Sequence, residues 1–155
     1  EQLFQKGPSR TGIHRHAIYV GPSYMSNYTV QADVMSTQKG RRRPDIGLIN
    51  AGYTMDMQGN HQRIEVRSWA AELRMAERFD FSWEPDIWYT LKLRVDSDDD
   101  KALIRGKIWP PDQSEPDEWT VTVEDDEPVR EGSPGLIGYS PIDIYFDNVR
   151  VMENQ

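Results

Sequence analysis

The sequence predicts an all-β fold, a β-sandwich of two antiparallel sheets. Two observations lead to this prediction. Apolar and polar residues alternate in many short segments, which is the pattern of strands that bury one face. Turn-forming residues separate these segments about every 8–12 residues, a spacing typical of β-sandwiches. The chain has 155 residues, the length of one domain.

Five segments alternate most clearly and are expected to be strands. They are Tyr28–Val34, Gln62–Trp69, Tyr89–Val95, Lys101–Trp109 and Ile144–Val151. The apolar residues that these strands turn inward, together with Leu136, form the predicted core. That core comprises Val30, Ala32, Val34, Ile64, Val66, Leu91, Leu93, Val95, Ile104, Ile108, Leu136 and Phe146.

Turn residues mark where the strands end. Gln58-Gly59-Asn60 and Ser97-Asp98-Asp99-Asp100 each separate two alternating segments, which predicts two hairpins. Residues 110–117 form a longer loop. Ser68–Arg78 contains good helix formers but fits alternation equally well, so helix and strand both stay open for it. Residues 1–12 are expected to be an N-terminal arm or linker remnant, and residues 13–155 a single sandwich domain.

Composition excludes several classes of function. The absence of cysteine rules out a disulfide framework, a thiolate zinc site and a cysteine nucleophile. The formal net charge is −8, which argues against nucleic-acid binding, because that requires surplus positive charge. No apolar run approaches the roughly 20 residues of a membrane span. We therefore expect no nucleic-acid partner and no membrane span.

Four motifs follow one another in the C-terminal half of the chain. A Trp-Tyr-x-Leu-x-Leu strand begins at Trp88, a second strand ends at Trp109, a Gly-x-x-Gly strand begins at Gly135, and Tyr145–Val149 reads Tyr-Phe-Asp-Asn-Val. In this order they resemble laminin-G-like, concanavalin-A-like jelly-roll domains. With Ser26–Val34 and the residues around Gly47 and Tyr53, the chain resembles more narrowly the domain that follows bacterial PQQ-binding-like β-propeller repeats.

The resemblance covers about residues 13–152 and implies two packed sheets in which the first and last strands are adjacent. Tyr28–Met35 is therefore expected beside Ile144–Met152. No single activity follows, because the superfamily includes lectins, carbohydrate-binding modules, glycosidases, lyases and adhesion modules.

The function we favour is a non-catalytic binding module of a larger protein. The resemblance implies that this protein is bacterial and exported, to the periplasm or outside the cell. Its expected partner is a polysaccharide, preferably an acidic glycan. Two alternatives stay open. One is a structural module that packs against a β-propeller domain of the parent chain, and the other is a polysaccharide lyase or glycoside hydrolase.

Arginine, lysine and tryptophan side chains concentrate on the outward faces of two predicted strands. Arginine forms bidentate hydrogen bonds to carboxylate or sulfate, and tryptophan offers a flat apolar face to a sugar ring. The candidate ligand-binding residues are Arg63, Arg67, Trp69, Arg105, Lys107 and Trp109. The alternative is that these cations pair with acidic residues across strands on a solvated face. The Arg41-Arg42-Arg43 run is expected in an exposed loop or against an acidic partner.

A structural calcium ion is the one cofactor considered. The family resemblance suggests Asp147 as its ligand, and the alternative is that Asp147 hydrogen-bonds a neighbouring loop. Asp96, Asp98 and Asp100 have the spacing of a calcium loop, but Lys101 stands where such a loop requires glycine. We interpret that run as a solvated hairpin tip.

Catalysis has two candidate arrangements. A glycosidase of this architecture needs carboxylates that alternate along one strand, and the nearest approach is Glu65 between two arginines. An alginate-lyase-like site would use Tyr53, His61, Gln62 and Arg63, which are close in sequence. The longer lysine–tyrosine–glutamine signature of those lyases is missing.

Overall fold

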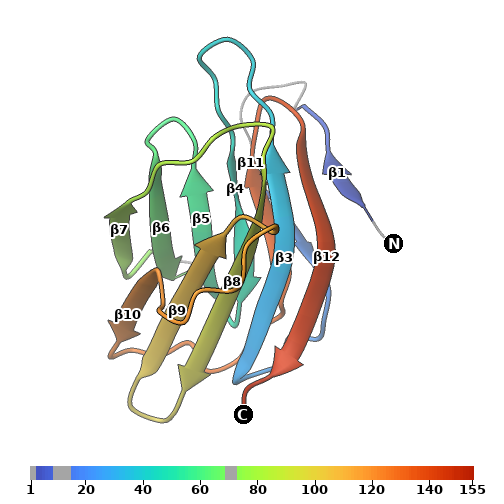
Figure 1. Cartoon of the computed structure of the whole chain (residues 1–155). Coiled ribbons are helices and arrows are strands. Elements are labelled where there is room, and N and C mark those ends of the chain that lie inside the picture. Colours follow the sequence, from blue (N-terminus) through green and yellow to red (C-terminus); the bar gives the residue numbers. More distant parts are fainter. Residues whose placement is uncertain (1–2, 9–14, 69–72) are drawn as a thin grey trace.

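The fold is all-β, and the prediction of a sandwich of two antiparallel sheets is confirmed. The computed structural model describes residues 3–8, 15–68 and 73–155. In these ranges, twelve strands form two six-stranded sheets that pack face to face (Figure 1). Within the described ranges there is no helix, so none is long and apolar enough to cross a membrane.

Sheet A contains the last strand of the chain beside an early one. Its order is β1 (Phe4–Lys6), β12 (Ile144–Glu153), β3 (Tyr28–Ser36), β8 (Trp88–Ser97), β9 (Ala102–Trp109) and β10 (Val121–Asp125). The expected neighbours are therefore adjacent, with Val34 opposite Phe146. β1 comes from the segment that the sequence set apart as an arm, and it pairs with β12 at the sheet edge.

Sheet B contains the strands that carry the polar face described below. Its order is β2 (Arg15–Tyr19), β11 (Gly135–Tyr139), β4 (Asp45–Asn50), β5 (Tyr53–Gln58), β6 (Arg63–Ser68) and β7 (Ala76–Asp80). In the ambiguous segment Ser68–Arg78, β7 shows that the described end is strand. A tight turn joins β4 to β5. Ala51 and Gly52 both have positive φ there, as a two-residue hairpin turn of this twist requires.

The core lies between the sheets and contains all twelve residues predicted for it. The sequence did not single out Ile46, Leu48, Met55, Met57 and Trp83, which are also buried there. Both predicted hairpins are confirmed, because β5 pairs with β6 and β8 with β9.

Buried polar side chains link the sheets through this core. The side-chain amide of buried Asn50, at the end of β4, donates hydrogen bonds to the carbonyl oxygens of Tyr28 and Leu93 in sheet A. Near the β7–β10 edge, the Tyr53 hydroxyl donates to Asp125, and Arg74 contacts the same carboxylate through two nitrogens. These links orient the outer faces of the sheets relative to each other.

Candidate functional site

The predicted binding residues lie on two opposite outer faces of the sandwich. Arg63 and Arg67 point outward from β6 of sheet B, because the residues between them, Ile64 and Val66, fill the core. Arg105, Lys107 and Trp109 point outward from β9 of sheet A by the same alternation. The core separates the two groups, so they cannot contact one small ligand together. Trp69 lies outside the described residues.

The outer face of sheet B carries a row of paired polar side chains on β5 and β6. Thr54 stands opposite Arg67, Asp56 opposite Glu65, and Gln58 opposite Arg63. All of these residues except Arg63 are buried. We call these six residues the sheet B polar row.

Arginines hold the carboxylates of the sheet B polar row in place. Arg67 donates from Nε to the Thr54 hydroxyl over 3.2 Å, and its guanidinium lies 3.8 Å from Asp56 and 3.9 Å from Glu65. Arg78 donates to Glu65 over 2.8 Å. A buried charge is tolerated only when it is paired in this way, so the row is an ion-pair network and not a set of unsatisfied cations.

Asp56 is the least well satisfied member of the row. Its Oδ1 atom has no hydrogen-bond partner. It lies against β4 at Gly47, where a Cβ atom would come within 2.7 Å of it. Burial raises the pKa of Asp56 to about 7, although Arg67 acts to lower it. This carboxyl group therefore changes charge near neutral pH.

A polar cavity of about 400 Å³ opens at the end of the same face. It is lined by Arg42, Arg43, Asp45, Asn60, His61, Tyr139 and Pro141. We call it the Asp45 cavity. It lies beside the sheet B polar row, because Asp45 in β4 pairs with Gln58 and with Tyr139.

The Asp45 cavity combines hydrogen-bonding groups with an aromatic ring. The Asp45 carboxylate accepts a hydrogen bond from the backbone N–H of Gly59 over 3.1 Å, which fixes its orientation. Burial nevertheless raises the pKa of Asp45 to about 6. The Arg15 guanidinium lies 5.6 Å from the centre of the Tyr139 ring. An acceptor, several donors and an aromatic face in one cavity are the groups that a sugar ring uses.

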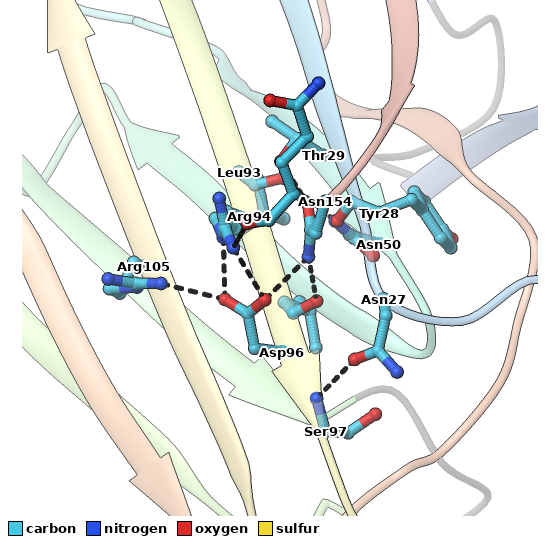
Figure 2. Close-up of polar contacts among 12 residues, drawn as sticks. Asn27, Tyr28, Thr29, Asn50, Leu93, Arg94, Asp96, Ser97, Arg105 and Asn154 are labelled. Atoms are coloured by element: carbon cyan, nitrogen blue, oxygen red, sulfur yellow. Dashed lines mark hydrogen bonds and ion pairs between the residues drawn. The ribbon is translucent and has the colours of Figure 1, made fainter.

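On sheet A, the predicted cationic side chains already form ion pairs with nearby carboxylates. Asp96 accepts hydrogen bonds from Arg94 and Arg105, and also from the Asn154 side chain (Figure 2). Glu115, in the loop after β9, accepts from Lys107 and contacts Lys92. The Arg105–Asp96 contact is the cross-strand pairing that the sequence left open as the alternative, and the pairing of the lysines with a loop carboxylate was not expected.

The Trp109 ring is not an exposed platform. Trp109 is only 8 % exposed, and the Lys92 ammonium lies 5.8 Å from its ring centre. The sequence missed the more accessible tryptophan of this face. Trp119 lies over Arg105 and Lys107, with their charged groups 4.9 and 4.7 Å from its ring centre.

Asp147 lies where β12 loses its regular pairing with β3. A bulge falls between Asp147 and Arg150, and Asn148 has a positive φ of 51°. The Asp147 carboxylate accepts a hydrogen bond from the backbone N–H of Asn148. Among the described residues, no three acidic or histidine side chains group closely enough to hold a metal ion. Calcium at Asp147 stays a prediction without structural support.

The residues of the lyase-like arrangement are not brought together. Tyr53 is buried in the core and bonds Asp125, whereas His61 lines the Asp45 cavity. Gln62 bonds the backbone of Gly59 and Trp83. The glycosidase interpretation gains one feature, because the Asp56 carboxyl group stands across from Glu65 on the same face.

For two of the missed site residues, the alternation of apolar and polar residues in the sequence was a usable signal. Asp56 and Gln58 alternate with Met55 and Met57, which indicates a strand with a polar outer face. The Asp45 cavity had no such local signal. Its residues come from β4, β11, the β5–β6 turn and the loops before β4 and after β11, and only strand pairing brings them together.

Solved structures of known proteins share this architecture. The carbohydrate-binding module CBM66 from Bacillus subtilis is 15 % identical with a TM-score of 0.67, over 97 % of this chain and 95 % of that one. Galectin LEC-6 from Caenorhabditis elegans is 10 % identical with a TM-score of 0.57, over 96 % of each chain. The catalytic domain of a GH131 β-glucanase from Podospora anserina is 9 % identical with a TM-score of 0.56, over 99 % and 72 %.

The fold is a concanavalin-A-like jelly roll. At these identities the similarity establishes the architecture, which galectins, a binding module and a glucanase domain share. No protein-family model matches the sequence, and neither does any curated protein sequence. The association with a β-propeller stays a prediction.

Proposed function

We propose that this protein is a non-catalytic carbohydrate-binding module whose saccharide site is the Asp45 cavity, extended by the sheet B polar row. The observation that carries the proposal is the cavity itself. It presents a carboxylate, an imidazole, two guanidinium groups, an amide and an aromatic ring on one face of the sandwich. Similarity in fold to a carbohydrate-binding module and to galectins supports the same function.

The charges on sheet B favour a neutral saccharide over the acidic glycan expected from the sequence. Arg63 and Arg67 already face carboxylates. In the cavity, Arg43 contacts Glu84, so that Asp45 and Arg42 leave no surplus of positive charge there. An anionic sugar would meet the Asp45 carboxylate at close range, whereas sugar hydroxyl groups would donate to it. We therefore assign sheet B to hydroxyl-rich, uncharged sugar units.

Binding at the Asp45 cavity is tested by a glycan array followed by titration calorimetry. Asp45→Asn should weaken binding of the best neutral glycan about tenfold or more, because a charged acceptor forms the stronger hydrogen bonds. Asp80→Asn is the matched control. Asp80 is an exposed carboxylate on the outer face of the same sheet and does not line the cavity. An array without neutral-glycan binding, or equal effects of the two variants, would contradict the proposal.

The pKa of Asp45 adds a second readout for the same site. Its value of about 6 means that the carboxylate becomes protonated as the pH falls through 6. Protonation removes part of its acceptor capacity. Affinity should therefore fall between about pH 7 and pH 5, and the fall should be absent in Asp45→Asn.

A glycosidase is the second candidate, and the Asp56–Glu65 pair is the observation that favours it. A carboxyl group whose pKa is about 7, next to another carboxylate, is the arrangement of a general acid and its partner. Both groups are buried, however, and line none of the described cavities. Product release from β-glucans or uronates that is lost in Asp56→Asn would favour the enzyme.

The structural-module alternative has one supporting feature at the β2 edge of the sandwich. Ile18, Tyr19 and Val20 are 50 %, 53 % and 40 % exposed, an apolar strip suited to contact with another domain. The propeller neighbour, the bacterial origin and the extracytoplasmic location rest on the sequence resemblance. Co-purification of this domain with its parent propeller, lost in Ile18→Lys, would support that role.

A further inference from the structure

The loop between β9 and β10 folds back over the outer face of sheet A. This face is opposite the Asp45 cavity and carries four cations on two adjacent strands. Lys92 stands opposite Lys107, and Arg94 opposite Arg105. Like charges at directly opposed positions of a sheet repel each other, so this surface requires negative charge from elsewhere.

Glu115 brings part of that negative charge from the loop. Its carboxylate accepts a hydrogen bond from the Lys107 ammonium over 3.0 Å, and its other oxygen contacts the Lys92 ammonium. Burial acts to raise the pKa of Glu115, but the two lysines outweigh it and the pKa is lowered. The Lys107 ammonium also donates to the carbonyl oxygen of Pro116, which holds the loop down.

The arginines of the same face have a different partner. Asp96, on β8, accepts hydrogen bonds from both arginines and from the side-chain amide of Asn154 (Figure 2). The Nε atom of Arg105 is buried and has no hydrogen-bond partner. Asp96 therefore belongs to the sheet, whereas the carboxylate that pairs with the two lysines comes from a loop.

The charges in this cluster do not balance. Four cations (Lys92, Arg94, Arg105 and Lys107) face two anions (Asp96 and Glu115) in the described contacts, and Glu153 in the adjoining pocket is a third anion. The excess is positive on a chain whose net charge is −8. A concentration of cations against the overall charge of the protein attracts polyanions.

A shallow pocket of about 290 Å³ extends this surface toward the C-terminal strand. Lys92, Arg94, Glu115 and Trp119 line it, together with Thr29 and residues of the C-terminal segment that include Glu153. It provides room for a sugar unit next to the lysines, and the Trp119 ring lies at its border. Sulfate or carboxylate groups on such a unit would reach the position that Glu115 now holds.

We propose that the outer face of sheet A is a second binding site, for sulfated or carboxylated polysaccharides, and that Glu115 occupies it in the unbound protein as an internal competitor. An anionic group of the polymer replaces the Glu115 carboxylate between Lys92 and Lys107. A tethered carboxylate acts at an effective concentration in the millimolar range. It therefore suppresses single weak anions but yields to a polymer that presents several.

This inference does not rest on the proposed saccharide site of sheet B, because the two sites share no residue. Separate experiments also test the two proposed sites. Asp45→Asn affects neutral glycans on one face, whereas substitutions of Glu115 affect polyanions on the other.

The test is calorimetric titration of the full chain with a heparin oligosaccharide of defined length. Glu115→Gln should raise the affinity about fivefold or more relative to wild type, because two ammonium groups lose their internal partner. Glu118→Gln is the matched control. Glu118 is an exposed acid of the same loop that makes no described contact, so its substitution changes the net charge equally without freeing a lysine.

The inference is overturned if Glu115→Gln and Glu118→Gln change the affinity equally, since net charge alone would then explain both. It is also overturned if the gain persists for a neutral oligosaccharide of the same length, or does not shrink between about 50 and 200 mM salt. Should Glu115→Gln fold poorly, Lys92→Gln tests the site in the opposite direction. It must weaken heparin binding more than Lys39→Gln, which removes an exposed loop charge. Equal effects of the two lysine variants would overturn it as well.

Discussion

The two outer faces of the sandwich carry similar side chains but satisfy them differently. On sheet B, Asp56 and Glu65 stand opposite each other on neighbouring strands, and buried Arg67, one pair along, contacts both carboxylates. On sheet A, the strands supply four cations and one of their carboxylates, and a loop supplies the other. On sheet B, strand pairing alone brings each charge to its partner. On sheet A, the lysines need a carboxylate from outside the sheet, and an external anion could supply it.

Replacing one arginine on each face should give the largest difference between the faces in the loss of stability. Arg67→Met leaves Asp56 and Glu65 without their shared buried cation and should lower the free energy of unfolding by about 3 kcal/mol. Arg105→Met removes a quarter-exposed cation from Asp96, which keeps Arg94, and should cost about 0.5–1 kcal/mol. Chemical denaturation of both variants measures the contrast. Equal losses would show that the faces are energetically alike.

Asp56 should give sheet B a pH dependence that sheet A lacks. Its pKa is about 7 in the folded protein against 3.8 as the ordinary value, so the folded state binds more protons between these limits. The free energy of unfolding should therefore fall by about 1–3 kcal/mol as the pH rises from about 4.5 to 7.5. In Asp56→Asn that fall should be smaller. Asp45, whose pKa is raised in the same direction, contributes the remainder.

Denaturation curves of wild type and Asp56→Asn across this range decide the point. Parallel pH profiles for the two proteins would show that Asp56 does not titrate there. Acids whose pKa is lowered, such as Asp96 and Glu115, affect stability only as the pH falls toward and below the ordinary values of 3.8 and 4.5. They do not obscure the comparison.

The smallest expected effect concerns the aromatic ring over the sheet A cations. Trp119→Leu keeps an apolar side chain over Arg105 and Lys107 but removes the ring's attraction for their charges. It should lower stability by about 0.5–1 kcal/mol. Thermal unfolding monitored by circular dichroism measures this loss. A loss several times larger would show that Trp119 is part of the core and not a cover of the sheet A face.

The fold was predictable because its signals are local. Alternation in Tyr28–Val34 and Tyr89–Val95 shows directly which side chains turn inward, and turn residues show where strands end. The adjacency of the first and last long strands required the family resemblance. The burial of Trp83 in a loop had no periodic signal at all.

The candidate site was less predictable because alternation assigns a residue to a face but not to a sheet. Arg63 and Arg105 both turn outward from alternating strands, and only the pairing of the strands shows that they lie on opposite sides. Glu115 and Trp119 come from a loop whose path no pattern specifies. Asp45 and His61 meet through non-local pairing, so their cavity was missed.

Asn50 fixes the position of one sheet relative to the other. Its amide bridges β4 to both β3 and β8, and a slip of one sheet past the other by a single residue, about 3.4 Å, would break both bonds at once. The sandwich therefore resists shear as one body. A chain of sugar held on sheet B and a polyanion held on sheet A would be fixed at a constant spacing and angle, so that the domain would act as a stiff crosslink between two polymers.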